Sequence, residues 1–261
     1  MKTLRSFTLL ALSSLLLFAC APAAETAPAA PTVVPATAIP PTQISTEVPT
    51  DITTVDESGN TSIDPTALAE SLAPLPATGL TAAESEALLY MREEEKLAHD
   101  VYVTLYEKWQ LSVFQNISES EQTHADAVKT LIERYGLTDP AAGAAVGTFT
   151  NATLQSLYDQ LVAQGSLSLA DAIKVGAAIE EIDILDLEER MTQTDKADII
   201  LVYESLMKGS RNHLRSFTST LQTQTGETYQ PQYLSLEAYN DIVGTPMESG
   251  GQGKGNGSGK P

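Results

Sequence analysis

The sequence predicts an all-α fold, a four-helix bundle whose second and third helices are joined by a long crossover that carries a short extra helix. Apolar residues recur at helical spacing in four long runs between about residues 78 and 243. Two of the three connections between these runs are short, whereas about thirty residues separate the second run from the third. No run alternates apolar and polar residues in the way expected of a half-buried strand.

The first two expected helices form a hairpin. The first opens at the capping box Thr81–Glu84 and continues to about Lys108. The second runs from about Ser112 to Tyr135 and stops at Gly136. A short connection between two amphipathic helices predicts antiparallel neighbours.

The crossover and the last two helices follow the same rules. A short amphipathic segment around 154–161 is ended by Gly165. The third long helix opens at a second capping box, Ser168–Asp171, and continues through Leu187. The fourth runs over about 195–222. The bundle is therefore expected to span residues 77–243.

The first twenty residues have the features of an export signal. A basic start precedes an apolar run, Leu9–Phe18, that is too short to span a bilayer as a mature helix. The run closes at Cys20 and resembles a bacterial lipoprotein signal. This resemblance implies removal of residues 1–19, lipidation of Cys20 and an extracytoplasmic protein anchored to the membrane by lipid. An ordinary secretory signal is the alternative.

The two ends of the mature chain are poor in apolar residues. Residues 20–76 are rich in Ala, Pro and Thr, and residues 244–261 are rich in Gly. Such segments bury too little apolar surface to offset the loss of conformational entropy on folding. We therefore expect a disordered tether before the bundle and a disordered tail after it.

Composition excludes several kinds of site and partner. Cys20 is the only cysteine, so one chain cannot form a disulfide, a thiolate zinc site or an iron–sulfur cluster. The 34 acidic and 15 basic residues give a formal charge of −19. A chain this acidic repels phosphate backbones, so nucleic acid is not an expected partner. Solubility of an exported domain is the alternative explanation of the charge.

Carboxylate and imidazole side chains occur at core-facing positions of all four long helices. An unpaired carboxylate in a core costs several kcal/mol, so such groups are normally paired, protonated or bound to metal. Together these ligand types suit iron or manganese, with zinc as a possible substitute. The candidate ligands are Glu95, Glu121, His124, Glu180 and His213, with Asp183 one turn after Glu180.

Four motifs resemble the ferritin-like superfamily of di-iron carboxylate proteins, and more particularly its DUF2202 branch, over about residues 84–240. Glu95 has Ala98 at +3 and Tyr102 at +7, the pattern of a helix-one ligand in ferritins and rubrerythrins. The helix-two E-x-x-H of the superfamily corresponds to Glu121 and His124. The segments that carry the resemblance are Arg92–Ala98 with Val101 and Tyr102, Ser120–His124, Gly176–Ile184 and Gly209–Arg215.

Helix four departs from that pattern. Di-iron members carry a second E-x-x-H there, whereas this chain has Ser210 three residues before His213. Asp183 or Glu181 could supply the missing oxygen ligand, or the site could hold a single ion. Tyr102, Glu181 and Arg211 are expected to support the ligands from adjacent positions.

The resemblance implies one or two iron or manganese ions and oxidation of Fe(II), or consumption of peroxide, with an external electron donor. Non-catalytic metal binding for storage or sensing is one alternative. A metal-free structural bundle with a buried Glu/Arg network, drawing on Arg211 and Arg215, is another. The sequence leaves the oligomeric state open.

Overall fold

The computed structural model describes residues 51–250, so the expected signal, Cys20, residues 20–50 and residues 251–261 lie outside the described part. This part is mostly helical, which confirms the all-α class, and adds one two-stranded hairpin. In chain order its elements are β1 (Thr53–Val55), β2 (Thr61–Ile63), α1 (Pro65–Leu72), α2 (Ala82–Trp109), α3 (Ser112–Arg134), α4 (Ala152–Gly165), α5 (Leu169–Met191), α6 (Ala197–Thr225) and α7 (Leu236–Val243).

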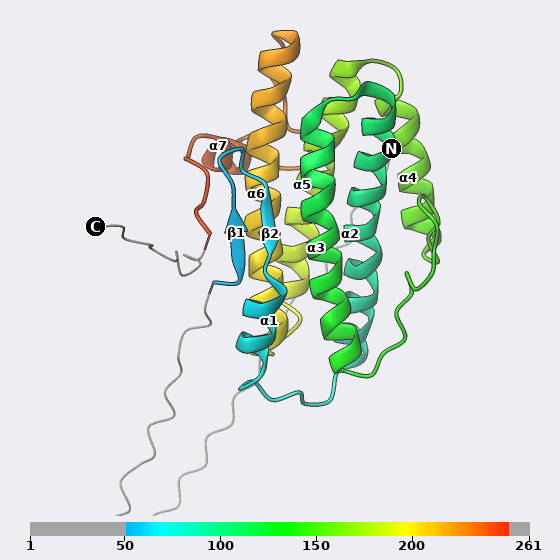
Figure 1. Ribbon diagram of the computed structural model, residues 1–261, viewed down its shortest axis with the longest axis vertical. Coiled ribbons are helices and arrows are strands. Elements are labelled where there is room, and N and C mark those ends of the chain that lie inside the picture. The colour runs from blue at the N-terminus through cyan, green and yellow to red at the C-terminus, as the bar shows by residue number, and fades with distance from the viewer. Residues whose placement is uncertain (1–50, 251–261) are drawn as a thin grey trace, which may run out of the picture. The chain divides into compact units, whose positions relative to one another are not determined.

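The four long helices lie alongside one another (Figure 1), with α2 packed on α3, α5 on α6, α3 on α6 and α2 on α5. The capping box at Thr81 and Glu84 forms as expected and satisfies amide groups at the start of α2. Gln110 adopts the left-handed conformation that ends α2, and α3 begins two residues later. The crossover after α3 carries α4, which packs against α2 and α5.

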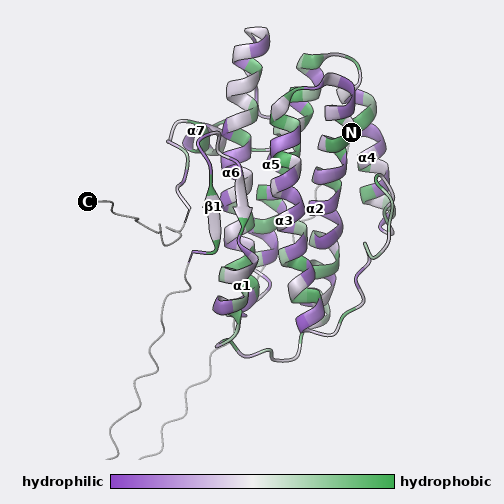
Figure 2. Ribbon diagram, viewed as in Figure 1, coloured by the Kyte–Doolittle hydropathy of each residue, from purple (hydrophilic) through white to green (hydrophobic). Residues whose placement is uncertain are grey.

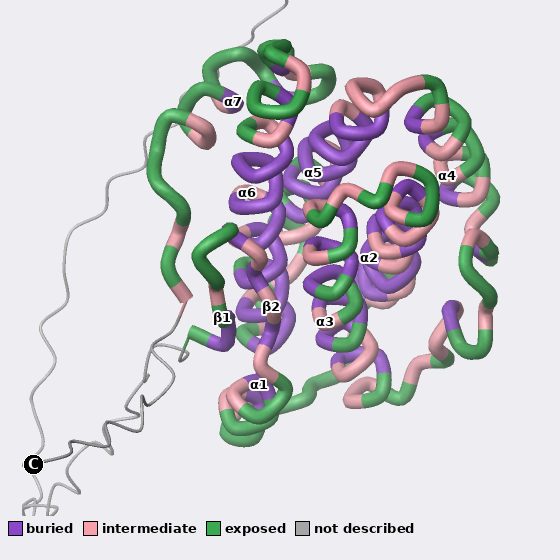
Figure 3. Tube along the Cα trace, turned by 45° about the horizontal axis from the view of Figure 1, so that its top comes forward, coloured by how far each residue is buried: buried purple, intermediate pink, exposed green. Residues whose placement is uncertain are grey.

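A polar layer divides the interior of the helices. Each long helix carries apolar and hydrophilic residues along its length (Figure 2). Buried stretches run along α2, α3, α5 and α6, and are most continuous on α5 and α6 (Figure 3). One apolar cluster includes Tyr102, Phe114 and Phe217, and a second includes Met91 and Leu131. The middle turns of the four helices lie between these clusters and carry buried charged residues instead of apolar ones.

The expected disordered tether was wrong for residues 51–76. The strands β1 and β2 pair in antiparallel register, with Thr53 opposite Ile63. The strand β2 packs on α3 and α6, and Ile52, Ile63, Leu68 and Leu72 are buried in the second apolar cluster. These few apolar side chains are diluted by polar neighbours, and the strands are three residues long, so composition and periodicity did not reveal them.

The expected disordered tail was wrong for residues 244–250. Glu248 forms ion pairs with Arg211 and Arg215, and its carbonyl oxygen accepts a hydrogen bond from Asn212. These contacts hold the segment after α7 against α6. None of the helices between residues 51 and 250 combines the length and the apolarity that crossing a bilayer requires.

Candidate metal centre

The polar layer brings together the five main candidate ligands. Glu95 comes from α2, Glu121 and His124 from α3, Glu180 from α5 and His213 from α6, and each is at most 2 % exposed. Their ligand atoms form two groups within 4.8 Å, Glu95 with Glu121 and His124, and Glu121 with Glu180 and His213. Either buried group could hold a metal ion.

Glu121 is common to both groups and lies between the two imidazoles. Its Oε2 is 2.8 Å from Nδ1 of His124, and its Oε1 is 2.8 Å from Nδ1 of His213. Glu95 Oε2 lies 3.5 Å from the first of these nitrogens, and Glu180 Oε2 lies 3.6 Å from the second. Each half therefore contains one imidazole, one carboxylate that belongs to that half alone, and one oxygen of the carboxylate of Glu121, which both halves share.

The strand β2 fixes the orientation of both imidazole rings. Nε2 of His124 donates to the carbonyl oxygen of Thr61 at 2.7 Å, and the amide of Thr61 lies 3.3 Å from Nε2 of His213. The side-chain amide of Asn212 donates a hydrogen bond to the hydroxyl oxygen of Thr61 at 2.9 Å. Thr61 was not among the candidate residues, because it lies in the segment expected to be disordered, where no sequence signal marks it.

The two halves of the centre differ in their proton arrangement. A carbonyl oxygen can only accept, so Nε2 of His124 carries a proton, and Nδ1, which lies 2.8 Å from the carboxylate of Glu121, holds either a second proton or, once that proton has left, a lone pair for a metal. A cation, either this proton or a metal ion, therefore lies between the nitrogen and the carboxylate. Nε2 of His213 instead receives an amide proton, so the His213 half is less well prepared for a metal at Nδ1.

The carboxylates have unequal affinities for protons. Burial raises the pKa of Glu95 to about 7, although His124 opposes the shift. Burial and the charge of Glu121 raise the pKa of Glu180 to about 7. Burial also disfavours the ionised form of Glu121, but the two imidazoles outweigh it and hold its pKa well below the usual range. Glu121 is therefore the most acidic of these three carboxylates.

The pKa values of both imidazoles are raised, whereas that of Glu121 is lowered. Burial disfavours the charged ring of His213, but Glu121 and Glu180 outweigh burial and raise its pKa to about 9. Burial is likewise outweighed by Glu121 and Glu95 at His124, whose pKa is raised well above its usual value. Without metal, protons therefore provide the positive charge that the carboxylates need.

Several buried polar atoms of the centre have no hydrogen-bond partner in the described part. An orphaned buried polar atom normally costs 1–3 kcal/mol or more, so a group of them in one place indicates an additional ligand. Two ligands bound at right angles to one ion at about 2.1 Å lie about 3 Å apart, close to the separations around Glu121. Glu95 Oε1 and Asp183 Oδ1 are orphaned, whereas Glu121 Oε1 and His213 Nδ1 lie 2.8 Å from each other without forming a hydrogen bond of good geometry. The residues present fit a bound metal.

Asp183 lies beside the centre at the place where helix four lacks an acid. Its Oδ2 accepts a hydrogen bond from the Ser210 hydroxyl, and its Oδ1 is unpartnered. Tyr102 lies where it was expected and donates to Glu180 Oε1 at 2.6 Å. Of the two carboxylates considered as replacements for the missing acid, the structure brings Asp183 to this place.

Two expected supporting residues lie elsewhere, so their assignment was wrong. Glu181 Oε2 accepts from the amides of Gln232, Tyr233 and Leu234 at 2.9, 2.6 and 3.0 Å, and so holds the segment after α6. Arg211 pairs with Glu248 on the outside of α6. Both residues neighbour a ligand in sequence or on the helix, but the helical twist turns them away from the polar layer.

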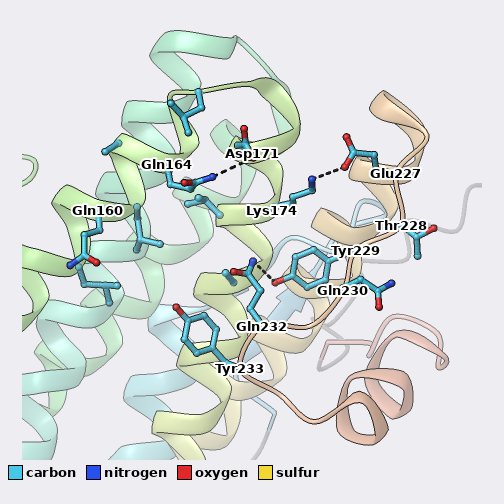
Figure 4. A pocket seen from close by; sticks show the side chains of 16 residues that line it. Gln160, Gln164, Asp171, Lys174, Glu227, Thr228, Tyr229, Gln230, Gln232 and Tyr233 are labelled. Carbon is cyan, nitrogen blue, oxygen red and sulfur yellow. Dashed lines mark hydrogen bonds and ion pairs between the residues drawn. The ribbon is translucent and has the colours of Figure 1, made fainter.

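A cleft of about 1070 Å³ lies between α4, α5 and the segment after α6, the segment whose amides donate to Glu181 (Figure 4). Lys174 pairs with Glu227 at its edge at 2.6 Å, and Gln232 donates to the hydroxyl of Tyr229 at 3.3 Å. Its described lining contains no histidine and little convergent charge. The residues that could ligate a metal are therefore in the polar layer and not in this cleft.

A domain-family model described as an uncharacterised protein domain, DUF2202, matches residues 84–246. The uncharacterised protein MJ0754 of Methanocaldococcus jannaschii is 51 % identical over 181 residues, which cover 69 % of this chain and 97 % of that protein. The crystal structure of the hypothetical protein MJ0754 from Methanococcus jannaschii DSM 2661 has a TM-score of 0.65 at 52 % identity and covers 67 % of this chain and 99 % of that one. The chain belongs to the DUF2202 family.

Proposed function

We propose that this chain is a ferritin-like protein whose polar layer binds two iron or manganese ions that share Glu121. The observation that carries the proposal is the position of Glu121, with one oxygen 2.8 Å from Nδ1 of each histidine. Glu95 and His124 complete one half, and Glu180 and His213 complete the other, with Asp183 beside it. The arrangement of carboxylates and imidazoles on four long helices supports a ferritin-like assignment.

The donor set favours some metals over others. Oxygen and imidazole donors suit iron and manganese, and zinc can replace them, whereas copper(I) prefers thiolates or thioethers. All three carboxylates and both imidazoles are buried, so a bound cation also relieves their mutual repulsion. The His124 half is expected to bind the first ion, because the Thr61 carbonyl keeps the proton on Nε2 and loss of the Nδ1 proton leaves a lone pair that faces Glu121.

A bound pair of iron or manganese ions supplies one-electron redox chemistry towards dioxygen or peroxide. The residues of the chain hold the ligands and exclude water. Tyr102 keeps Glu180 in place through a 2.6 Å hydrogen bond, and Thr61 covers the histidine side. An electron-delivering iron–sulfur centre within the chain would need several cysteines, and Cys20 is the only one. The reductant therefore comes from another protein or a small molecule.

We place the protein outside the cytoplasm, anchored to the membrane through lipid on Cys20. The basic start, the short apolar run and Cys20 support this location. The acidic charge argues against a nucleic-acid partner. Labelling with a radioactive fatty acid tests the anchor, and it should be abolished by Cys20→Ser.

The metal-free alternative, a buried Glu/Arg network, lacks the contacts it needs. Arg211 and Arg215 both pair with Glu248, outside the polar layer. No arginine or lysine forms an ion pair with Glu95, Glu121 or Glu180 among residues 51–250. Metal binding therefore remains the better account of the buried carboxylates.

Anaerobic loading tests the proposal directly. The full chain, stripped of metal, should bind two Fe(II) ions, and admission of air should produce a ferric absorbance band in the near ultraviolet. Binding of ions without that band would support storage or sensing instead of oxidation. Absence of stoichiometric iron, manganese or zinc binding would contradict a metal centre.

A further inference from the structure

The cleft of about 1070 Å³ lies outside the proposed metal centre, because none of the proposed ligands lines it. Its three walls are seen in Figure 4: α4 carries Gln160 and Gln164, α5 carries Asp171 and Lys174, and the segment after α6 carries residues 227–233. Ligand-binding clefts commonly enclose about 300–1,000 Å³, so this one has room for a ligand of several rings.

The lining is rich in uncharged side chains that form hydrogen bonds. Four of its exposed side chains are glutamines, Gln160, Gln164, Gln230 and Gln232. Each carboxamide has two donor hydrogens and an acceptor oxygen. Within residues 51–250, no protein group donates to these four oxygens. The cleft therefore presents both donors and acceptors, as a ligand with many hydroxyl groups requires.

The charged side chains of the lining are engaged with the protein. Lys174, the lysine of the cleft, pairs with Glu227 at 2.6 Å. The carboxylate of Asp171 accepts hydrogen bonds from the hydroxyl of Ser168 at 2.6 Å and from the side chain of Gln164 at 3.3 Å. An anionic ligand would have to break the ion pair to find a cation, so the cleft favours a neutral ligand.

Aromatic and apolar groups lie among the glutamines. The ring of Tyr233 is 51 % exposed, and Leu167 at the edge is 70 % exposed. Tyr229, Val175 and Ala178 are buried beneath them. A tyrosine ring has an apolar face and a polar tip. A sugar ring likewise has C–H groups on its faces and hydroxyls around its edge, so it can pack on such a side chain while the glutamines bind its hydroxyls.

The wall after α6 is fixed in place by a buried charge. The carboxylate of Glu181 accepts hydrogen bonds from the amides of three consecutive residues, 232–234, at 2.9, 2.6 and 3.0 Å. Burying a carboxylate is costly, and here it orders a segment whose side chains at 232 and 233 are exposed to the cleft. A segment ordered in advance loses less entropy when it binds a ligand.

We propose that this cleft binds a neutral oligosaccharide, with Tyr233 packed against one sugar ring and the glutamines hydrogen-bonded to hydroxyl groups. The site is independent of the proposed metal centre and goes beyond it. An extended peptide is less well suited, because α4, α5 and the segment after α6 present no strand edge for main-chain pairing.

Calorimetric titration of the full chain tests the ligand class. The probes are neutral hexasaccharides of glucose, mannose, xylose and N-acetylglucosamine, with the charged hexamer of galacturonic acid for comparison. At least one neutral hexamer should bind, and its monosaccharide should bind at least about tenfold more weakly because it makes fewer contacts. Failure of every neutral hexamer to bind, or equally tight binding of the galacturonic acid hexamer, would overturn the proposal.

Substitutions at exposed positions locate the binding. Tyr233→Ala should weaken it about tenfold, because the ring contact is lost, whereas Tyr233→Phe keeps the ring and should stay close to the wild type. Gln232→Ala should weaken binding about fivefold through a lost hydrogen bond. Gln224→Ala, exposed and outside the lining, is the matched control and should change nothing.

Two results would remove the oligosaccharide from this cleft. One is an unchanged affinity in Tyr233→Ala. The other is displacement of the bound sugar by a synthetic peptide of residues 20–50, because proline-rich segments also pack on aromatic side chains. That second result would assign the cleft to the chain's own tether.

Discussion

Gly209 packs directly against the imidazole ring of His124, with the ring where a β-carbon would have to lie. The ring is thereby held between α6 on one side and Glu121 on the other. Gly209→Ala is expected to displace the ring and weaken metal binding by about 10- to 100-fold, as changes next to a ligand usually do. Gly79→Ala, where an added β-carbon meets nothing, is the matched control. Equal affinities in calorimetric titrations of the two variants would show that the ring tolerates the shift.

Removal of the shared carboxylate should affect both halves of the centre. Glu121→Gln deletes the charge that lies 2.8 Å from each histidine nitrogen, and we expect loss of both ions. Glu119→Gln removes an exposed charge from the same helix and should keep full occupancy. Metal content after gel filtration distinguishes them. One retained ion in Glu121→Gln would refute the shared role.

The backbone of Thr61 should matter more than its side chain. Thr61→Pro removes the amide proton and disturbs the strand, and metal affinity should fall by about 10- to 100-fold because the rings lose their orientation. Thr61→Val keeps the backbone contacts and loses only the two hydrogen bonds of the hydroxyl, one from Asn212 and one to the carbonyl oxygen of Gly59, at a cost of about 1–3 kcal/mol in unfolding free energy. Similar metal affinities in the two variants would contradict a backbone role.

Asp183 should decide the number of ions held. Asp183→Asn keeps the shape of the side chain but removes the charge that replaces the missing acid of helix four. We expect the His213 half to lose its ion, so that the metal count falls from about two to about one. Asp171→Asn, near the start of the same helix and away from the centre, is the control. If Asp183→Asn still binds two ions, the prediction is contradicted, and Glu180 and His213 hold the second ion together with Glu121 without help from Asp183.

Without metal, the protein should lose stability as the pH rises from about 4.5 to about 9. The pKa values of Glu95 and Glu180 rise from 4.5 to about 7, and that of His213 rises from 6.5 to about 9, so the folded state holds more protons than the unfolded state in this window. The contribution of Glu121, whose pKa is lowered, is complete above 4.5 and adds no slope there.

Thermal melting in the presence of a chelator measures this effect, with falling midpoints expected at pH 5, 7 and 9. Bound metal replaces the protons, so the loaded protein should show a flatter profile and should release protons on binding. A midpoint that rises with pH in the metal-free protein would refute the assigned directions.

The long helices and the main ligands could be predicted because helical spacing and burial act locally. Glu121 and His124 fall on the apolar stripe of α3, and Thr81 begins α2 with a capping box that forms as expected. Thr61 could not be predicted, because its role comes from a contact with residues 63 and 152 positions away.

The carbonyl that orients His124 belongs to residue 61, while the match to the domain family begins at residue 84. Ligands and orienting backbone are thus encoded in separate stretches of the gene. Exchanging that stretch between family members is expected to change the orientation of the two rings, and with it the metal affinity of the proposed centre, without altering any proposed ligand.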